Sequence, residues 1–351
     1  MENDKNQSEL LIHSCNTEGH PISILVTGTG GGAGQSILKS LQHTDYRVVA
    51  VDSEVLGTGL YTANIGYVIP YANSPNFIEK LLEICQLENV KLLFPGLDAE
   101  LIILSKNREK FAKIGVVVVV SDEQVVTICD DKLLTAQFLQ QNGFGAPQTW
   151  ILSDYPSDQK IFPLILKPKT GGARSKGVYI VNSSEELEKL SKELDGTAFV
   201  VQEFINGTEF TCGTLTLEGH CVGSITLRRI LRDGDTYKAF VERNEMIEDF
   251  VARVANVLQP FGPCNFQLRI REGIPLIFEF NGRCSGTTFC RTLAGFNEPR
   301  MIADYLLKLL TPKFFIKPVT ILRYWKELVV DNEVVSACVA TGKVNFPSGL
   351  L

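Results

Sequence analysis

Four polar side chains stand among apolar residues in the stretch CNFQLRIREGIPLIFEFNGRCSGTT, and they are Gln267, Glu279, Asn281 and Arg283. The stretch alternates as a β-hairpin does, with REGIP as its turn. If Gly273 is the centre of that turn, Gln267 faces Glu279, and Asn265 faces Asn281. A charge or amide in a core is costly unless something binds it. The pattern therefore predicts a ligand site on one face of the hairpin.

The polar face of this hairpin suits a metal ion and a phosphoryl group. Gln267, Glu279 and Asn281 carry oxygen atoms, which Mg²⁺ prefers when it also binds nucleotide phosphates. Arg283 ends the same strand and is suited to stabilise charge on a transferring phosphoryl group. A slip of the register by one residue would separate these side chains. We therefore predict a site for Mg²⁺, or for Mn²⁺, with Arg283 beside it.

A second group of residues suits a triphosphate. Lys132 lies in CDDKLLT, and Lys167 ends the apolar strand LILKP, so that its ammonium projects from a buried platform. The loop TGGARSKG follows, and its backbone amides and cations are able to close over phosphates. A single lysine is normally a solvated charge, but two lysines and a basic glycine loop together favour phosphate binding. The loop residues in question are Gly171, Gly172, Arg174 and Lys176.

The stretch AFVVQEFINGTEF adds features that a nucleoside requires. Adenine needs an apolar slot with backbone donors and acceptors at its rim, and ribose needs a carboxylate acceptor. Residues 201–205 are candidates for the slot, and Glu209 for the ribose contact. An edge strand with exposed acids is the alternative interpretation, and it would be preferred if this stretch stood alone.

The glycine loop VTGTGGGAGQS follows an apolar strand and opens a helical pattern, with Asp52 at the end of the next strand. The spacing of Gly28, Gly30 and Gly34 is compatible with a dinucleotide site in which Asp52 binds a ribose. A tight turn, or a loop that faces a substrate through Gly30 and Gly31, fits the same residues. The motif alone is a weak indication of NAD(P) binding.

Other substrate candidates remain open between function and structure. Asp98 and Glu100 follow a strand at the carboxyl edge, where open α/β sheets bind ligands. Equally, Asp98 suits a helix N-cap and Glu100 a first helical turn. In LRRILRDGDTYKAF, side chains alternate, so that at least one basic residue is expected to face the cleft. The residues considered are Arg228, Arg229, Arg232 and Lys238, of which Arg228 and Lys238 are taken as candidates for substrate contact.

The elements that must position these residues fall into two patterns. From Ile22 to about residue 122, strand-length apolar runs alternate with helices, which predicts an α/β domain with a parallel sheet of the Rossmann-like type. From Pro163 onward, strands separated by glycine and asparagine turns indicate an α+β region with antiparallel pairing. Helices are expected at DAELIILSKNREKFAKI and DDKLLTAQFLQQNGF, among others.

Composition limits the partners. The 351 residues carry a net charge of −6, so nucleic acid and anionic lipid are improbable partners. The longest apolar run, IGVVVVV, is too short to cross a bilayer. The N-terminal residues are acidic where a secretory signal is basic, and nine cysteines without a CxxC pair suggest free thiols rather than disulfides or zinc. We expect a cytoplasmic protein, with a homodimer as the default oligomeric state.

As an ordered set, DKLLT, LILKPKTGGARSKG, VQEFINGTE and NFQ…FEFNGR resemble the ATP-grasp superfamily. The resemblance extends from Ile22 to about Leu310 and is closest to the branch of carbamoyl-phosphate-synthase-like proteins and carboxylate-amine ligases, which includes the ligase of pyrrolysine biosynthesis. It implies a tail at 1–20, a preceding Rossmann-like domain at 21–122, and an ATP-grasp domain at 123–310. Within the last, a lid at 123–204 precedes a metal-binding subdomain at 205–310, and 311–351 is a C-terminal segment without assignment.

The resemblance also implies roles for single residues. Lys132 and Lys167 would contact the nucleotide, Glu203 with the adjacent backbone of Phe204 and Ile205 the adenine, and Glu209 the ribose. Lys167, Arg174 and Arg283 would stabilise transferring charge. The glycine-loop domain would face the substrate, which lowers the weight of the dehydrogenase interpretation. FNGR stands where many relatives have proline after the asparagine.

The activity implied is that of an ADP-forming ligase. A substrate carboxylate would attack the γ-phosphorus of MgATP, and an amine would displace phosphate from the acyl phosphate to form an amide. The partners are then a small-molecule carboxylate and an amine. Carbamoyl phosphate synthesis itself is doubtful, because the chain has one copy of the motif set. A non-catalytic nucleotide-binding protein is the rival, although the complete set of polar residues argues against it.

Overall fold

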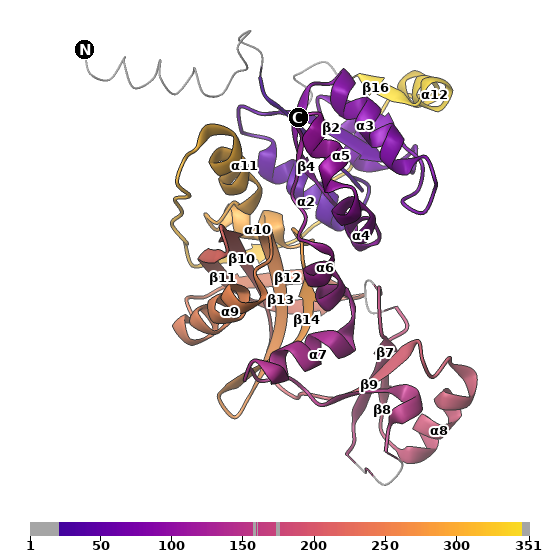
Figure 1. Ribbon diagram of the computed structural model, residues 1–351, viewed down its shortest axis with the longest axis vertical. Helices are drawn as coiled ribbons and strands as arrows, with labels where there is room; N and C mark the ends of the chain where they lie inside the picture. Colours follow the sequence, from indigo (N-terminus) through magenta and orange to yellow (C-terminus); the bar gives the residue numbers. More distant parts are fainter. Residues whose placement is uncertain (1–20, 157–158, 160, 173–175, 346–351) are drawn as a thin grey trace, which may run out of the picture. The chain divides into compact units, whose positions relative to one another are not determined.

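A computed structural model describes residues 21–345, apart from 157–158, 160 and 173–175. Contacts divide the described chain into two compact units. The first unit contains the residues up to Ser121, residues 283–316 and the residues from Trp325 onward. The second contains 122–282 and 317–324. Figure 1 shows the elements of both.

The first unit is built on a six-stranded sheet with the order β16-β3-β2-β1-β4-β5. Strands β1 to β5 pair in parallel, and β16 is antiparallel to β3. The predicted parallel sheet is therefore confirmed. The elements of this unit are β1 (Ser23–Val26), α2 (Gly32–Leu41), β2 (Arg47–Asp52), the 3₁₀ helix η1 (Thr58–Tyr61), β3 (Ile65–Val68), α3 (Phe77–Leu87), β4 (Val90–Phe94), α4 (Asp98–Lys106), α5 (Arg108–Lys113), β5 (Val117–Val118), α10 (Thr288–Leu293), α11 (Glu298–Lys308), α12 (Asn332–Thr341) and β16 (Lys343–Asn345).

The single helix predicted over DAELIILSKNREKFAKI is two helices. Asn107 separates α4 from α5, and its side-chain Nδ2 donates to the carbonyl of Ile103 at 2.8 Å. An asparagine side chain that bonds to the backbone in this way competes with the helical hydrogen-bond pattern. The strand β3 was not predicted, because a four-residue run interrupted by Gly66 carries little periodic signal.

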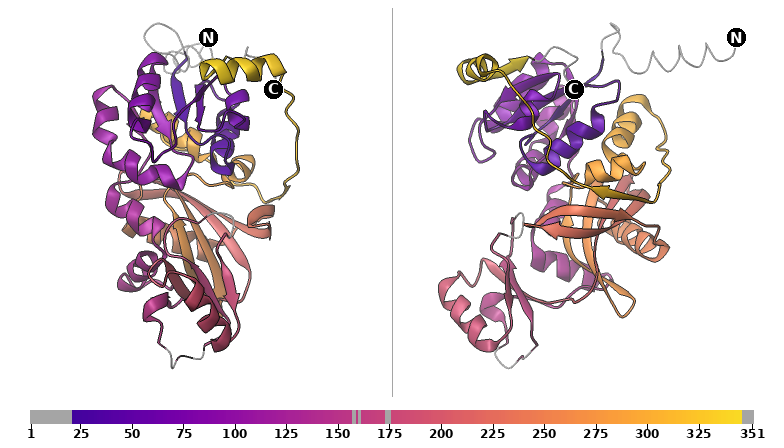
Figure 2. Two further views of the ribbon diagram at one scale, coloured as in Figure 1. Left: turned by 90° about the vertical axis from the view of Figure 1, so that its right-hand side faces the viewer. Right: turned by 180° about the vertical axis from the view of Figure 1, so that it is seen from behind.

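The second unit contains two antiparallel sheets, which confirms the predicted α+β pattern. The large sheet has the order β14-β13-β10-β11-β12-β15, and the small sheet β6-β9-β7-β8. Strand β15 lies beside β12 at the edge of the large sheet (Figure 2). The elements are α6 (Glu123–Asp130), α7 (Lys132–Gln141), β6 (Thr149–Ile151), the 3₁₀ helix η2 (Leu152–Asp154), β7 (Leu164–Pro168), β8 (Tyr179–Val181), α8 (Ser184–Glu193), β9 (Phe199–Glu203), β10 (Glu209–Leu217), β11 (His220–Arg232), β12 (Asp235–Val241), α9 (Glu245–Leu258), β13 (Gly262–Arg271), β14 (Ile274–Asn281) and β15 (Val319–Leu322).

Each sheet of the second unit has an apolar face covered by helices. Phe266 and Phe280 of the large sheet pack with Phe250 of α9 and Leu139 of α7. The small sheet packs its apolar side chains against Leu187 of α8. Burial of these faces is the main stabilising contribution to the unit. It leaves the opposite face of the large sheet available for polar residues.

The division of the chain differs from the predicted domains in three places. Helices α6 and α7, assigned to the lid, pack against the large sheet instead. Helices α10 and α11 belong to the first unit, where Asn297 Nδ2 donates to the Ser40 carbonyl at 2.8 Å. The unassigned C-terminal segment contributes β15 to the second unit and β16 to the first. Amphipathic helices show which face is buried, but not which neighbour buries it.

Two predictions from composition can be compared with the described residues. In this part of the chain, no helix is long and apolar enough to cross a membrane. Eight of the nine cysteines lie within it, and all eight are free thiols, seven of them buried. The N-terminal tail predicted over residues 1–20 lies outside the described part.

Candidate functional site

The hairpin of β13 and β14 has the register that the sequence predicted at its polar end. Gln267 pairs with Glu279, and Asn265 pairs with Asn281. The turn is different, because Arg271 pairs with Ile274 and leaves a two-residue loop at positions 272 and 273. Both loop residues have positive φ, as a type I′ hairpin turn requires. The centre of the turn therefore lies between Glu272 and Gly273, half a residue before the predicted centre at Gly273.

A β-bulge restores the register between the turn and the polar end. Leu268 pairs with Ile277 whereas Gln267 pairs with Glu279, so Phe278 is an extra residue without a partner on β13. Its carbonyl accepts a hydrogen bond from Lys167 Nζ at 3.3 Å. The bulge therefore both aligns the polar face and frees a backbone acceptor for the buried lysine.

Lys167 is the buried cation of the site. Its Nζ also donates to Gln202 Oε1 at 2.9 Å, and the residue is 7% exposed. Burial is the main cause that lowers the pKa of Lys167 to about 8, and the charge of Lys132 acts in the same direction, while Glu279 and Glu209 oppose the shift. The lysine predicted to project from a buried strand thus lies in the pocket with a lowered pKa.

A chain of hydrogen bonds joins the polar side chains of the hairpin. Gln267 Nε2 donates to Glu279 Oε1 at 3.1 Å, and Asn281 Nδ2 donates to the same oxygen at 3.0 Å. Gln267 Oε1 instead accepts from Arg229 Nη2 at 2.5 Å. Glu279 and Asn281 thus offer oxygens on the polar face, but Gln267 turns its amide nitrogen toward Glu279. It would have to rotate that amide to act as an oxygen ligand beside Glu279.

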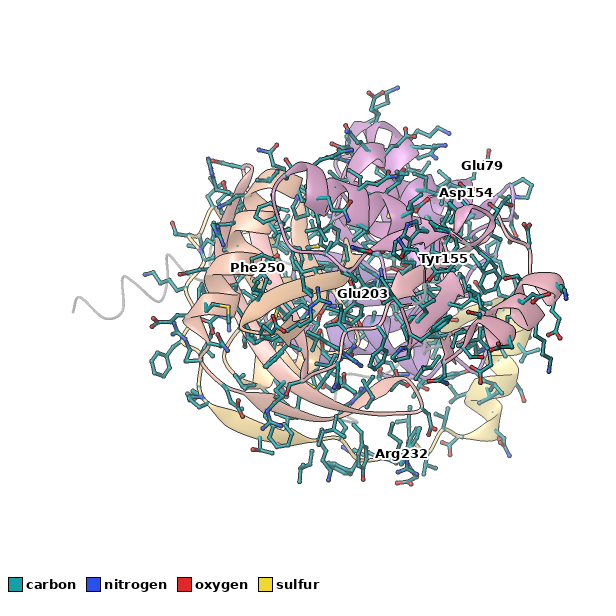
Figure 3. All side chains as sticks on the ribbon, turned by 90° about the horizontal axis from the view of Figure 1, so that it is seen from below. Glu79, Asp154, Tyr155, Glu203, Arg232 and Phe250 are labelled. Carbon is teal, nitrogen blue, oxygen red and sulfur yellow. The ribbon has the colours of Figure 1, made fainter. Side chains whose placement is uncertain are left out.

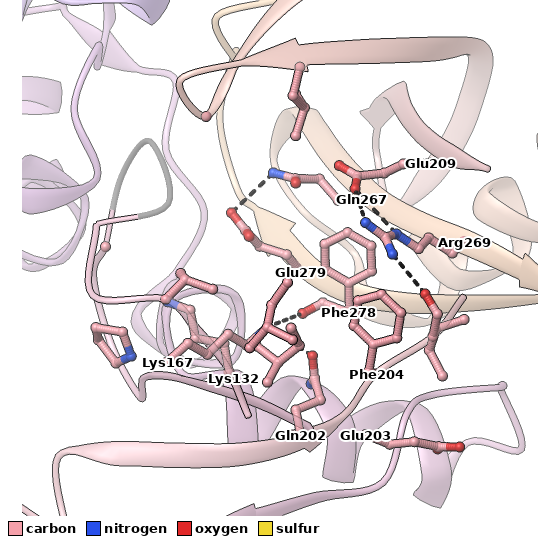
Figure 4. Close-up of a pocket in the computed structure, with 18 of the residues that line it drawn as sticks. Lys132, Lys167, Gln202, Glu203, Phe204, Glu209, Gln267, Arg269, Phe278 and Glu279 are labelled. Carbon is pink, nitrogen blue, oxygen red and sulfur yellow. Dashed lines mark hydrogen bonds and ion pairs between the residues drawn. The ribbon is translucent and has the colours of Figure 1, made fainter. Parts of the chain in front are cut away.

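Gln267, Glu279 and Arg229 line a pocket of about 430 Å³ in the second unit, and Asn281 contacts it through its bond to Glu279 (Figure 4). The pocket is lined by residues of both sheets and of the loop that follows β7. The structure brings together most of the residues predicted for nucleotide and metal binding. Those that line the pocket are Lys132, Lys167, Gly171, Gly172, Lys176, Glu203, Phe204, Ile205, Glu209, Gln267 and Glu279.

Glu209 is held by two arginines. Arg229 Nε donates to Glu209 Oε1 at 2.9 Å, and Arg269 Nη2 donates to Oε2 at 2.8 Å. Burial by itself would raise the pKa of Glu209, but the two guanidinium groups outweigh it and lower that pKa. The carboxylate predicted to bind a ribose therefore already has a partner on each oxygen. Arg269 was not predicted, although its position two residues from Gln267 places it on the same face.

The predicted adenine slot lies partly in the pocket. Residues 202–205 line it, whereas Val201 is fully buried in the small sheet. Further apolar surface in the pocket comes from Ile165, Leu231 and Phe278. The side chain of Glu203 forms an ion pair with Arg271 and points away from Lys132 and Lys167 (Figure 4).

Arg269 also fixes the backbone next to that slot. Its Nη1 donates to the Ile205 carbonyl at 2.8 Å, and its guanidinium lies 5.3 Å from the centre of the Phe204 ring. Phe204 and Ile205 are thus in place to present backbone groups beside an apolar surface. One arginine connects this segment to Glu209.

The basic residues of β11 and β12 are distributed differently from the prediction. Arg229 lines the pocket, whereas Arg228 and Lys238 do not. Successive residues of a strand point to opposite faces, and Lys238 pairs with Ile230, on the face of Arg228. Arg228 instead pairs with Glu242 at 2.8 Å and stacks on Phe240. The candidates Arg228 and Lys238 were therefore wrong as pocket residues, and Arg229 takes that place.

Arg232 does not line the pocket either, although Leu231 and Gly234 do. Its side chain, which is labelled in Figure 3, is 66% exposed. Its nearest ionic neighbour is Asp233, at 3.8 Å. It is a solvated charge at the end of a strand.

The glycine loop after β7 approaches Lys132. Lys132 Nζ donates to the Gly171 carbonyl, and Gly171 N donates to Asp130 Oδ1 at 2.9 Å. Gly171 and Gly172 both have positive φ, which other residues adopt rarely. Arg174, predicted in the same loop, lies outside the described residues.

The glycine loop of the first unit uses Asp52 for its own structure. Gly30 N donates to Asp52 Oδ2 at 2.6 Å, and Glu54 N donates to the other oxygen at 2.9 Å. A Cβ at Gly34 would lie 2.3 Å from the Gly28 carbonyl oxygen, so this glycine is required for a tight turn. The geometry favours the structural interpretation of the motif over a ribose contact by Asp52. Gly31, the other substrate candidate, is the N-cap of α2.

The three remaining candidates, Asp98, Glu100 and Arg283, all lie in the first unit. Arg283 pairs with Asp98, and its Nη1 donates to the Cys284 carbonyl at 2.8 Å. Asp98 is the first helical residue of α4, and Leu97 is the N-cap, so the N-cap alternative for Asp98 does not hold. Glu100 lies in the first turn as predicted, but it is 3% exposed and accepts from the Thr27 hydroxyl. The pair of Asp98 and Arg283 is the more accessible feature.

Glu100 is expected to make the stability of the first unit depend on pH. Burial raises its pKa to about 7, and hydrogen bonds from Thr27 and the backbone only partly oppose this. Because the pKa of Glu100 is higher in the folded than in the unfolded protein, its contribution to the free energy of unfolding is complete below about pH 4.5 and is lost as pH rises to about 7. The loss is of the order of 3 kcal/mol. In urea unfolding at pH 5 and pH 8, Glu100→Gln is expected to abolish this loss.

The exposed carboxylate Glu109 of α5 supplies a matched control for that measurement. Glu109→Gln should leave the difference between pH 5 and pH 8 as in the unchanged protein. An unchanged difference in Glu100→Gln would contradict the assignment of this pH dependence to the buried carboxyl.

Two families match the chain. The family described as "PylC-like, N-terminal domain" matches residues 22–119. The family described as "ATP-grasp in the biosynthetic pathway with Ter operon" matches residues 195–326. The first match covers the parallel strands of the first unit, and the second covers all six strands of the large sheet of the second unit.

Three known proteins illustrate the similarity. A carbamoyl-phosphate synthase of Methanobrevibacter smithii is 27% identical over 237 residues, which are 62% of this chain and 64% of that protein. The crystal structure of an L-amino acid ligase from Bacillus licheniformis has a TM-score of 0.66 at 18% identity and covers 86% of this chain and 79% of its own. The N5-carboxyaminoimidazole synthetase from Staphylococcus aureus complexed with ADP has a TM-score of 0.69 at 16% identity, with 86% and 82% covered. The chain thus spans 64% of the length of the synthase, less than two thirds, and the two crystal structures have the same fold as this chain.

Proposed function

Since the chain belongs to the ATP-grasp superfamily, we propose that it is an ADP-forming carboxylate-amine ligase that depends on Mg²⁺ and works through an acyl phosphate. One observation carries this proposal. A single pocket joins Lys132, Lys167 and Lys176 to the polar face of Glu279. A polyphosphate with a divalent cation satisfies both sets of charges.

The pocket residues fit a nucleotide. Ile165, Leu231 and Phe278 offer apolar surface to a base, and Lys132, Lys167 and Lys176 offer cations to phosphates. The glycines of the loop after β7 leave its backbone amides accessible to phosphate oxygens. Arg229 and Arg269 each bind one oxygen of Glu209. We therefore assign the sugar contact to these three side chains together rather than to a free carboxylate.

The polar face also fits a magnesium ion that is completed by phosphate oxygens. Among the described residues, no group of three His, Cys, Asp or Glu side chains is able to hold a metal ion. Glu279 and Asn281 supply one carboxylate and one amide oxygen, which is enough for Mg²⁺ when a nucleotide supplies the rest. Gln267 becomes a further ligand if its amide rotates. The bound ion would neutralise charge on the phosphates.

The chain's own residues then have defined tasks in the reaction. Lys167 stabilises negative charge on the transferring group from a buried position, where electrostatic interactions are stronger than in water. Gly171, Gly172 and Lys176 of the loop after β7 contact the phosphates. In the first unit, Arg283 offers its guanidinium group to the carboxylate of the acid substrate. No side-chain nucleophile takes part.

We assign the binding of the acid and amine substrates to the first unit. We propose that its sheet is of the Rossmann-like type, on its strand order β3-β2-β1-β4-β5, with Gly30 and Gly31 facing substrate. The pair of Asp98 and Arg283 offers one charge of each sign, which suits a substrate that carries both an amine and a carboxylate. The similarity to an L-amino acid ligase supports amino acids as the first candidates. A cytoplasmic location and a homodimer belong to the same proposal.

The decisive test is the release of ADP and phosphate from MgATP across a panel of amino acids and small carboxylates, each with and without an added amine. We expect one pair to stimulate release at least about tenfold, and Glu279→Ala to abolish it. Binding of nucleotide without turnover of any pair would favour a non-catalytic binding protein. Binding of NAD(P)H that depends on Asp52 would support the dehydrogenase alternative instead.

A further inference from the structure

A fully buried ion pair lies in the first unit, a few residues after Arg283 in the sequence. Arg291 of α10 and Glu298, the first residue of α11, are both 0% exposed, and Arg291 Nε donates to Glu298 Oε1 at 2.5 Å. Burying two charges is seldom the most stable solution, because apolar residues of similar volume fill the same space without desolvation. The pair therefore calls for a reason other than stability.

Glu298 itself shows that the pair is not optimised for stability. Among the described residues, its buried Oε2 has no hydrogen-bond partner. Burial also raises the pKa of Glu298, although Arg291 opposes the shift. A buried polar atom without a partner is rare in folded proteins and calls for an explanation.

The Nη1 and Nη2 atoms of Arg291 donate hydrogen bonds to one turn, residues 285–288, which we call the Ser285–Thr288 turn. Its Nη1 donates to Thr287 Oγ1 at 2.7 Å and to Ser285 Oγ at 3.2 Å, and its Nη2 donates to Thr288 Oγ1 at 2.9 Å. The planar guanidinium group thus contacts three buried hydroxyls at once. A lysine at this position has no such fixed geometry.

The three hydroxyls in turn determine the backbone of the turn. Ser285 N donates to Thr288 Oγ1 at 2.9 Å, and Thr287 N donates to Ser285 Oγ at 3.2 Å. Each side chain that accepts a hydrogen bond from Arg291 therefore also fixes a backbone amide or a neighbouring hydroxyl. Loss of the guanidinium group would leave these hydroxyls free to rotate and the turn free to move.

The turn connects the two features assigned to substrate in this unit. It begins two residues after Arg283, which pairs with Asp98. Its Gly286 carbonyl accepts from Ser36 Oγ of α2 at 3.0 Å, and a Cβ at Gly286 would meet only Gly32, at 3.9 Å. Movement of the turn would thus change both the position of Arg283 and the contact with the glycine loop.

We propose that Arg291, with Glu298, is a positioning residue that fixes the Ser285–Thr288 turn and thereby places Arg283 for the substrate. Arg291 touches no ligand itself, because it is fully buried. The part that concerns substrate rests on the proposed ligase function. The part that concerns the turn does not.

The test compares the full-length protein with Arg291→Met/Glu298→Leu, which removes both charges and keeps the volume. Arg47→Met/Glu88→Leu is the matched control, since this ion pair of the same unit joins β2 to the residue after α3. Hydrogen exchange of the turn amides, KM for the acid and Kd for the nucleotide are measured in each. Arg291→Lys, which keeps the charge beside Glu298, replaces the double variant if that one does not fold.

We expect exchange of the turn amides to be at least tenfold faster and KM for the acid at least tenfold higher, with nucleotide Kd within twofold of the unchanged protein. The control should alter none of the three. Unchanged exchange overturns the proposal, and so does faster exchange with unchanged KM. If no acid and amine pair supports turnover of the unchanged protein, the ligase function fails, and exchange alone decides whether Arg291 fixes the turn.

Discussion

Glu279→Gln is expected to lower ADP formation from MgATP and both substrates by at least about 10³-fold, or about 4 kcal/mol. Glu279 supplies the carboxylate of the polar face, and its Oε1 accepts from Gln267 and Asn281. Glutamine keeps an oxygen that can accept these bonds, so the hairpin should stay folded. What is lost is the negative charge that a magnesium ion requires.

Binding of ADP with and without Mg²⁺ tests this without knowledge of the substrates. Mg²⁺ should tighten ADP binding at least about tenfold in the unchanged protein and less than about twofold in the variant. Glu242→Gln is the control, because Glu242 pairs with Arg228, which lies on the other face of the large sheet. Retention of the Mg²⁺ effect in Glu279→Gln would rule out this residue as the metal carboxylate.

Nucleotide binding is expected to weaken as pH rises above about 8 and to be accompanied by proton uptake. Burial lowers the pKa of Lys167 to about 8, so the free protein loses this charge above that pH. Phosphate oxygens favour the ammonium form, so binding must restore the proton. Below pH 8 the ammonium is already present and no uptake is expected. Above it, Kd should rise by up to about tenfold per pH unit, with uptake of close to one proton.

Calorimetric titration in two buffers that differ in ionisation enthalpy, at pH 7 and pH 9, measures this uptake. Lys167→Met keeps the buried volume and should bind more weakly at pH 7, without proton uptake at pH 9. Lys176→Met, which removes an exposed cation of the pocket, should weaken binding at both pH values and retain the uptake. A pH-independent Kd in the unchanged protein would show that Lys167 is not the phosphate contact.

The hairpin shows how much of a structure a periodic sequence pattern predicts. Alternation along β13 and β14 was enough to place Gln267 opposite Glu279, since side chains two apart share a face. The pairing was nevertheless predicted from a turn centre that the structure does not have. A shorter turn and the bulge at Phe278 compensate for one another. A bulge has no clear mark in the sequence, because its cost is offset by contacts such as that of Lys167 with the Phe278 carbonyl.

The arginines show where local pattern fails. Arg228 and Arg229 are adjacent and chemically identical, so the sequence shows only that they point in opposite directions. The pairing of β11 with β10 decides that Arg229 meets Glu209 and lines the pocket. Register between strands distant in the chain depends on packing of the whole sheet. Arg269 was not predicted for a related reason. Its role depends on contacts with Ile205 and Glu209, which are distant from it in the sequence.

The sequence by itself determined the alternating α/β pattern, the antiparallel region and most of the polar residues that gather in the pocket, because periodicity and residue chemistry are local properties. Tertiary structure alone decided which carboxylates are already paired, such as Glu203 with Arg271, and which are buried, such as Glu100. It also assigned α10 and α11 to the first unit and placed Arg291 beneath the Ser285–Thr288 turn. These outcomes depend on contacts between residues far apart in the chain, and no local pattern encodes which apolar faces will meet.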